Sequence, residues 1–171
     1  MTKVINLFAG PGAGKSTNAA GIFYEMKSRG INCELVTEYA KDCVWEDRYG
    51  VLQDQIYVFG KQHHRLWKLQ GKVDYVITDS PLYLSYMYAN SEDKGIIEAV
   101  VRQYASKMDN INIFVERTKK YNPIGRMQTE EQAKTLDDEI KGIVHKFSRF
   151  DFTINSTTPI NLTVDKILEV K

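Results

Sequence analysis

One stretch of the sequence decides the fold: Val4-Ile5-Asn6-Leu7-Phe8-Ala9-Gly10-Pro11-Gly12-Ala13-Gly14-Lys15-Ser16-Thr17. It begins as a short apolar strand and continues into a glycine-rich turn that ends in Gly-Lys-Ser, a pattern typical of loops that hold the phosphates of a nucleoside triphosphate. Gly10, Gly12 and Gly14 lack a Cβ atom, so the backbone can adopt positive φ there and turn successive N–H groups toward phosphate oxygens. The stretch therefore predicts a phosphate-binding loop, to which Ala13 also contributes its N–H group.

Two side chains and a helix complete the predicted phosphate site. Lys15 places a cation at the β- and γ-phosphates, and the hydroxyl of Ser16 is a ligand for Mg²⁺. A helix that begins near Lys15 directs its unpaired N–H groups and its partial positive charge at the same anion. Ala9 stands where the strict motif has its first glycine, so the match is to a relaxed form of the motif.

Length and composition indicate one globular domain over residues 1–171. The chain has 171 residues, of which 43% are hydrophobic and 26% are charged, enough for one well-packed core. The formal net charge is only +1, so the overall charge gives no case for binding nucleic acid or an acidic membrane. Cys33 and Cys43 form no zinc or redox motif, and no apolar stretch is long enough for a signal-peptide core or a membrane span. We therefore expect reduced structural cysteines and a cytoplasmic location.

Strands and helices alternate along the chain. Apolar stretches predict strands at residues 4–8, 32–37, 73–78, 111–116 and 152–155, and helical patterns predict helices at residues 15–29, 51–69, 81–89, 94–107 and 129–147 and near the C-terminus. A short helix or a loop is expected between residues 38 and 49. This alternation predicts an α/β fold, a three-layer doubly wound parallel sheet of about five strands, with its ligand site at the carboxyl ends of the strands.

Asp79 closes the strand predicted at residues 73–78 and should lie beside the phosphate-binding loop. A carboxylate in that position can hold Mg²⁺ directly or through water. The next residue is Ser80, whereas hydrolytic ATPases of this class usually have a second carboxylate there to activate water. The chain also contains no Asn-Lys-x-Asp stretch of the kind that reads guanine in GTPases. These features favour transfer of a phosphoryl group over hydrolysis.

Glu38 follows the second predicted strand and should face the same crevice as Lys15 and Asp79. A hydroxyl that accepts a phosphoryl group needs a carboxylate within hydrogen-bonding distance to orient it and to accept its proton late in transfer. Glu38 and Asp79 are the two candidates for this base. The alternative for Glu38 is a surface carboxylate that begins the next helix, and the sequence leaves both interpretations open.

A cationic segment follows the fourth predicted strand. Residues 117–126 contain Arg117, Lys119, Lys120 and Arg126 around an Asn-Pro turn, which suits a lid at about residues 117–128. Guanidinium groups that close over a nucleotide stabilise the charge that develops on the transferred phosphoryl group, so Arg117 and Arg126 would be the clamps. The alternative is an ordinary charged surface loop.

The helix predicted at residues 51–69 offers candidates for substrate binding. Gln55, Phe59 and Gln62 recur at helical spacing on one face, so an amide and an aromatic ring could read and stack a planar base. The competing interpretation places Phe59 in the core and leaves the glutamines in solvent.

Several motifs together resemble the P-loop nucleoside and nucleotide kinases, and the resemblance covers nearly the whole chain. These motifs are the loop at residues 10–17, Thr37-Glu38, Thr78-Asp79-Ser80-Pro81 and the segment from Arg117 to Arg126. The resemblance implies Mg-ATP binding by Lys15, Ser16 and Thr17, a catalytic acidic pair of Glu38 and Asp79, and a lid closed by Arg117 and Arg126.

A narrower resemblance concerns the substrate. Residues 36–42, 55–59, 75–82 and 121–126 are similar to small bacteriophage proteins labelled as ATPases or kinases, some of which phosphorylate 5-hydroxymethyluracil in phage DNA. The resemblance implies an ATP-dependent kinase in the host cytoplasm that acts on a hydroxyl of a nucleoside-like acceptor, with 5-hydroxymethyluracil in DNA as the first candidate. A free deoxynucleoside or a nucleoside monophosphate is the alternative acceptor, and a partner-stimulated P-loop ATPase or switch is the alternative of another class. The near-neutral charge counts against tight binding of duplex DNA.

Overall fold

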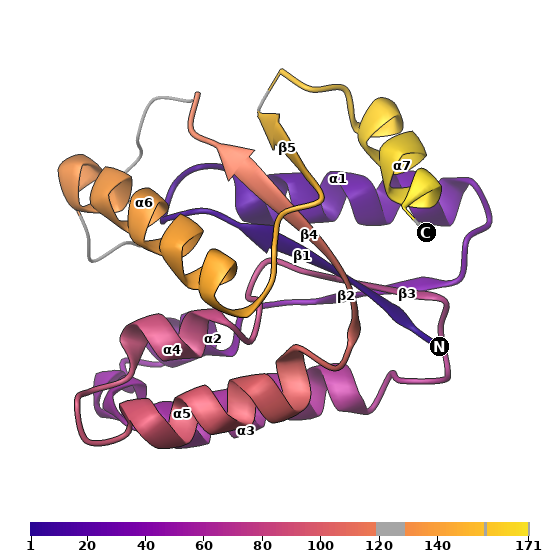
Figure 1. Ribbon diagram of the computed structural model, residues 1–171. Helices are drawn as coiled ribbons and strands as arrows, with labels where there is room; N and C mark the ends of the chain where they lie inside the picture. Colours follow the sequence, from indigo (N-terminus) through magenta and orange to yellow (C-terminus); the bar gives the residue numbers. More distant parts are fainter. Residues whose placement is uncertain (119–128, 156, 171) are drawn as a thin grey trace.

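The computed structural model describes residues 1–118, 129–155 and 157–170. In these residues five parallel strands form one sheet, in the spatial order β2-β3-β1-β4-β5 (Figure 1). The strands are β1 (Lys3–Phe8), β2 (Cys33–Val36), β3 (Tyr75–Thr78), β4 (Asp109–Glu116) and β5 (Phe152–Asn155). The predicted α/β fold with a parallel sheet of about five strands is confirmed.

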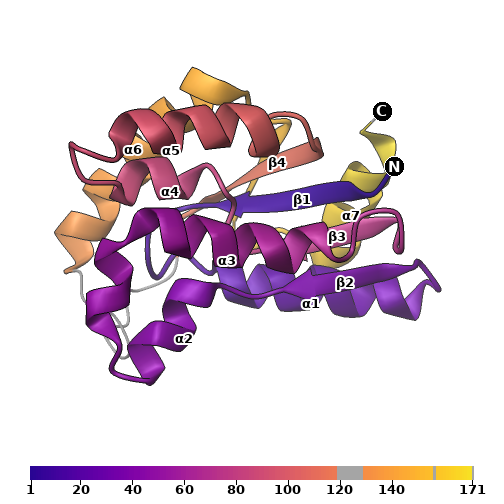
Figure 2. The ribbon, with the colours of Figure 1, turned by 90° about the horizontal axis from the view of Figure 1, so that it is seen from below.

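Helices cover both faces of the sheet and make it the middle of three layers (Figures 1 and 2). One face packs against α1 (Lys15–Ser28) and α7 (Ile160–Glu169). The other face packs against α3 (Gln55–Trp67), α4 (Leu84–Tyr88), α5 (Lys94–Val100) and α6 (Glu130–Phe147). Between β2 and α3 lie α2 (Tyr39–Trp45) and the 3-10 helix η1 (Tyr49–Gln53), and a π-helical turn, η2 (Val101–Ala105), follows α5.

β1 is the central strand, and its side chains join both cores. Val4 and Phe8 are buried in the core beneath α3 to α6, whereas Ile5 and Leu7 are buried in the core beneath α1 and α7. Successive side chains of a strand point to opposite faces, so a strand covered on both sides is apolar along its length. This explains why the segment before the glycine-rich turn is nearly unbroken in apolar character.

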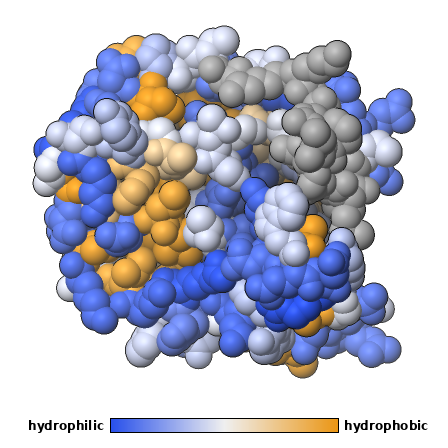
Figure 3. Space-filling model, turned by 180° about the vertical axis from the view of Figure 1, so that it is seen from behind, coloured by the Kyte–Doolittle hydropathy of each residue, from blue (hydrophilic) through white to orange (hydrophobic). Residues whose placement is uncertain are grey.

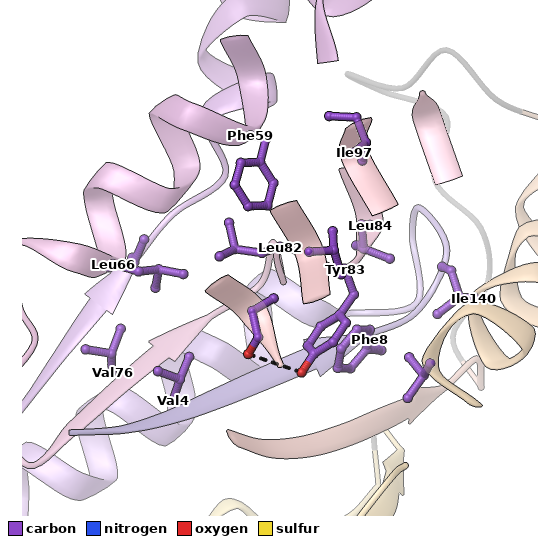
Figure 4. Close-up of a cluster of buried hydrophobic side chains, with 14 of the residues drawn as sticks. Val4, Phe8, Phe59, Leu66, Val76, Leu82, Tyr83, Leu84, Ile97 and Ile140 are labelled. Carbon is purple, nitrogen blue, oxygen red and sulfur yellow. Dashed lines mark hydrogen bonds between the residues drawn. The ribbon is translucent and has the colours of Figure 1, made fainter. Parts of the chain in front are cut away.

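The core beneath α3 to α6 fixes the end of β1, from which the glycine-rich loop begins. Phe8, the last residue of β1, packs against Tyr83, with the ring centroids 5.8 Å apart (Figure 4). It also packs against Phe150, with the ring centroids 5.6 Å apart. Tyr83 is itself buried, and its hydroxyl donates a hydrogen bond to the Ala105 carbonyl at 3.4 Å. Phe59 of α3 belongs to the same cluster. The loop therefore starts from a rigidly packed strand end.

Two predicted helices differ in detail from the structure. The helix expected at residues 51–69 begins only at Gln55, because the Asp54 side chain accepts a hydrogen bond from the Tyr57 N–H at 3.0 Å and caps it. Aspartate favours this capping position over a helix interior, and the residues before it form η1. The helix expected at residues 94–107 is α-helical up to Val100 and π-helical from Val101 to Ala105.

Two further expectations concern the environment of the chain. Cys33 and Cys43 are buried free thiols, as predicted. Across the ranges that the structure describes, every helix is too short or too polar to span a membrane.

The packing of β1 leads to a stability prediction. Ile5→Ala should lower the free energy of unfolding by about 3 to 4 kcal/mol, because it opens a cavity in a fully buried site. Ile96→Ala is the matched control, since Ile96 is 54% exposed, and it should change the free energy of unfolding by less than about 1 kcal/mol. Urea denaturation of both variants measures the difference, and equal losses would contradict this description of the core.

Candidate active site

The carboxyl ends of three adjacent strands bring the predicted site residues to one edge of the sheet. The glycine-rich loop leaves β1, Asp79 directly follows β3, and Glu38 lies two residues beyond the end of β2. The charges of Glu38, Asp79, Asp137 and Arg117 all act on the pKa of Lys15, so these groups lie within electrostatic range of the same ammonium. The structure therefore gathers Lys15, Glu38, Asp79 and Arg117, as the sequence predicted.

The loop has the backbone conformation that its glycines allow. Gly12 and Gly14 have φ values of 82° and 101°, and Gly14 is the N-cap residue of α1. The first backbone hydrogen bond of α1 runs from the Asn18 N–H to the Gly14 carbonyl at 2.9 Å. The N–H groups of the preceding three residues, 15 to 17, therefore lie before the helical hydrogen-bond ladder, where an anion can accept them.

Gly10 is needed for a reason other than the one the sequence suggested. It does not have a positive φ. A Cβ atom at Gly10 would instead lie 2.5 Å from the Ala133 carbonyl oxygen and 2.9 Å from Asp137 Oδ1 of α6. Gly10 therefore lets a helix backbone approach the loop closely.

Lys15 lies over the loop. Its ammonium donates hydrogen bonds to the carbonyl oxygens of Ala9 at 2.7 Å and Gly10 at 3.2 Å. Burial lowers the pKa of Lys15, and the carboxylates of Glu38, Asp79 and Asp137 partly oppose this effect. A desolvated ammonium ringed by carboxylates is suited to hold the oxygens of a phosphate chain.

Ser16 and Asp79 form a pair that fits a magnesium ion. The Ser16 hydroxyl donates to Asp79 Oδ2 at 2.5 Å. Asp79 is only 6% exposed, and its Oδ1 is buried without a hydrogen-bond partner among the described residues. A buried carboxylate oxygen normally has a partner, and hydroxyl and carboxylate oxygens are the ligands that Mg²⁺ prefers. No cluster of three or more His, Cys, Asp or Glu residues suited to a metal ion occurs in the described residues.

Glu38 is half-buried opposite Lys15. Burial raises the pKa of Glu38, the Lys15 ammonium lowers it, and the Asp79 carboxylate raises it further. Glu38 is the N-cap residue of α2, but its side chain makes no capping hydrogen bond. Glu38 thus stands at the start of the helix, as the alternative interpretation expected, but its carboxylate is half-buried and does not cap that helix.

The candidate substrate residues of α3 lie within the protein framework. Gln62 accepts a hydrogen bond from the Tyr39 N–H at 2.9 Å and donates one to the Thr37 carbonyl at 3.3 Å, so its amide fixes the backbone on both sides of Glu38. The amide of Gln55 donates to the Leu52 carbonyl at 2.6 Å, and Phe59 is buried in the core. These contacts correct the expectation that the three side chains read a base, because each is engaged within the fold.

Arg117, one of the two expected clamps, is anchored within the fold. Its side chain is 8% exposed and forms an ion pair with Asp137, with Nε 3.0 Å from Oδ2. Its guanidinium also donates to the carbonyl oxygens of Pro11 at 2.9 Å and Ala133 at 3.4 Å. Arg126 and most of the predicted lid at residues 117–128 lie outside the described residues.

One residue near the site, Asp137, was not predicted from the sequence. Asp137 contacts the loop and Arg117 from α6, and it shares the buried face of that helix with Ala133, Ile140 and Val144. A carboxylate on the apolar face of an amphipathic helix is unusual, so this pattern could have identified Asp137 from the sequence.

A groove of about 430 Å³ lies beside the edge strand β2. Its lining includes Thr37, the residue directly before Glu38 in the sequence. The groove is lined by Glu34, Leu35, Val36, Thr37, Asp42, Arg65, Lys68 and Leu69. Arg65 is paired with Asp42 at 2.5 Å. Seen from behind, the molecule has one area in which apolar surface gathers, bordered by hydrophilic side chains (Figure 3).

Several solved kinase structures are similar to this chain. The NadR protein in complex with NR matches with a TM-score of 0.71 and 17% identity, over 98% of this chain and 51% of the NadR chain. Deoxyadenosine kinase from M. mycoides with dCMP and dCDP matches with a TM-score of 0.59 and 17% identity, over 96% of both chains. APS kinase CysC from Mycobacterium tuberculosis matches with a TM-score of 0.51 and 13% identity, over 98% of this chain and 95% of that kinase.

These similarities establish the P-loop nucleoside and nucleotide kinase fold. The chain spans about half the length of the NadR protein, of which 51% is covered. No protein-family model and no curated protein sequence matches it.

The environment of Glu38 leads to a prediction on pH. Because the pKa of Glu38 is raised above the ordinary value of 4.5, the folded protein binds this proton more tightly than the unfolded chain does. The contribution of Glu38 to the free energy of unfolding should therefore be present below pH 4.5 and decrease as the pH rises through the folded-state pKa. Urea denaturation across this pH range should show Glu38→Gln becoming more stable relative to wild type as the pH rises, and a constant difference would contradict the assignment.

Proposed function

We propose that this protein is an ATP-dependent kinase that transfers the γ-phosphoryl group to a hydroxyl of a nucleoside-like acceptor. The observation that carries the proposal is the Asp79 carboxylate, which is held by Ser16 through one oxygen and has its other oxygen buried without a partner among the described residues. This is the arrangement expected for a carboxylate that holds Mg²⁺ beside a triphosphate. Ser16 and Asp79 would hold Mg²⁺ there, and the ion would supply neutralisation of the phosphate charge.

Each residue of the site has a proposed task. Lys15 and the N–H groups at the start of α1 bind the β- and γ-phosphates, and Arg117 faces the charge that develops on the transferred group. Glu38 is the candidate base. A general base works best when its pKa is close to the working pH, and the pKa of Glu38 is raised toward neutral pH. Asp79 is the alternative base.

ATP as the donor is supported by the similar structures. A NadR structure that matches with a TM-score of 0.72 and 15% identity, over 98% of this chain and 49% of that one, contains NAD and AMP-PNP. The chain has Ser80 after Asp79, where a hydrolytic ATPase has a second carboxylate, so transfer to an acceptor is favoured over a switch or motor.

Two acceptors follow from different observations. The resemblance of residues 36–42, 55–59, 75–82 and 121–126 to phage kinases favours the hydroxymethyl group of 5-hydroxymethyluracil in DNA. That base would have to leave the stack to reach Glu38. The net charge of +1 and the pairing of Arg65 with Asp42 beside Glu38 favour a free nucleoside or nucleotide, the type of substrate that deoxyadenosine kinase takes.

An acceptor panel tests the function. Incubation with γ-labelled ATP, Mg²⁺ and separate samples of 5-hydroxymethyluracil DNA, unmodified DNA, nucleosides and nucleoside monophosphates should give one labelled acceptor. Label on 5-hydroxymethyluracil DNA but not on unmodified DNA supports the first acceptor, and label on a free nucleoside or monophosphate supports the second. Label found only as inorganic phosphate with every acceptor would contradict the kinase proposal.

A variant of Asp79 tests the mechanism. Asp79→Asn should lower the transfer rate by about a hundredfold or more, because an amide binds Mg²⁺ more weakly and does not neutralise its charge. ATP binding in the absence of Mg²⁺ should persist, as measured by calorimetry. Asp74→Asn is the control. Asp74 is an exposed carboxylate just before the first residue of β3, whereas Asp79 follows the last residue of that strand. Full activity of Asp79→Asn would remove Asp79 from the mechanism.

A further inference from the structure

Asp137 is a buried carboxylate that has no task in the proposed chemistry. It is 9% exposed and lies on the face of α6 that also buries Ala133, Ile140 and Val144. A carboxylate on an apolar helix face is costly unless donors satisfy both of its oxygens. Its partners therefore show what the residue is for.

Both oxygens of Asp137 are bonded to parts of the candidate active site. Oδ1 accepts a hydrogen bond from the Gly10 N–H at 2.5 Å, and Oδ2 accepts one from Arg117 Nε at 3.0 Å. The Gly10 amide belongs to the phosphate-binding loop, and Arg117 directly follows β4. One carboxylate thus connects the loop, the arginine and α6.

Further contacts make this connection rigid. Arg117 donates to the Pro11 carbonyl at 2.9 Å, so the guanidinium is also bonded to the loop itself. It donates as well to the Ala133 carbonyl at 3.4 Å, one turn before Asp137 in α6. The close approach of Gly10 to the backbone of α6 leaves no space for a side chain between the loop and the helix.

The arrangement holds a charge within electrostatic range of the phosphate site. The charges of Asp137 and Arg117 act on the pKa of Lys15 in opposite directions. A long arginine side chain has many rotamers in solvent, and a guanidinium fixed in advance needs no reorganisation when charge develops nearby. Fixing Arg117 is therefore a task that Asp137 can perform without contacting substrate.

We propose that Asp137 is a positioning residue for phosphoryl transfer, which holds the Arg117 guanidinium against the phosphate-binding loop through bonds to both. This inference rests on the proposed kinase function. It assigns a task to a residue of α6, outside the loop and outside the acidic pair of Glu38 and Asp79.

The first test is the pair of variants Asp137→Asn and Asp138→Asn. Asparagine keeps the size of the side chain but has only one acceptor oxygen and no charge, so Asp137→Asn should lower kcat by about tenfold or more. The dissociation constant for ATP should change by less than about threefold, because the loop amides and Lys15 remain. Asp138 is the neighbouring carboxylate, with a side chain that is 83% exposed, and its variant should keep the kcat of wild type. A kcat of Asp137→Asn within twofold of wild type would overturn the proposal.

The second test separates positioning from a merely structural role. If Asp137 acts through Arg117, then adding Asp137→Asn to Arg117→Ala should lower kcat by less than about twofold beyond Arg117→Ala alone. A further loss as large as that in the wild-type background would show that Asp137 acts independently of Arg117 and would overturn the proposal.

A measurement on the unaltered protein keeps the proposal testable if the variants fail to fold. In ¹⁵N-labelled wild type, Mg²⁺-free ATP should shift the Gly10 N–H and Arg117 Nε–H resonances with the same midpoint concentration. An Arg117 resonance that stays unchanged at saturating ATP would overturn the proposal. If wild type labels no acceptor, the proposed function fails, and this titration alone decides whether Arg117 is held at the nucleotide site.

Discussion

A site that holds a triphosphate must concentrate positive charge, and this requirement organises the whole carboxyl edge of the sheet. Lys15 and the N-terminus of α1 provide that charge at the loop after β1. Burial works against the ammonium, and the carboxylates of Glu38, Asp79 and Asp137 partly compensate. The acidic residues therefore have two functions: they offset the cost of a buried cation, and they are positioned where a metal ion, an acceptor and an arginine are needed.

Each of the three carboxylates is held in a different way. The Ser16 hydroxyl bonds to Asp79, and Gly10 and Arg117 bond to Asp137. Glu38 is held indirectly, because Gln62 bonds to the backbone on either side of it. Asp79 keeps one buried oxygen without a partner in the described residues, and the Glu38 side chain makes no capping hydrogen bond at its helix. Of the three carboxylates, the two proposed to do chemistry are thus less engaged by the framework than Asp137.

The sequence predicted the five strands, the loop and the convergence of Lys15, Glu38 and Asp79, because local patterns and the topology of parallel sheets decide all three. It did not predict the tasks of Gln55, Phe59 and Gln62, since helical spacing shows that residues share a face but not what that face contacts. The close approach of α6 to Gly10 is equally invisible in the sequence, because it joins segments 127 residues apart. The start of α3 could have been predicted from Asp54, a good N-cap residue followed by a helical pattern.

The proposed preference for transfer over hydrolysis agrees with the positions of the two acidic residues. Hydrolytic ATPases of this class usually have a second carboxylate directly after the metal ligand, where it activates water. Here the residue after Asp79 is Ser80. Its backbone N–H donates a hydrogen bond to the Thr78 hydroxyl oxygen at 3.1 Å. The second carboxylate, Glu38, comes instead from the neighbouring strand β2. The proposed base and the proposed metal ligand thus come from two neighbouring strand ends, and no carboxylate directly follows Asp79 to activate a water molecule.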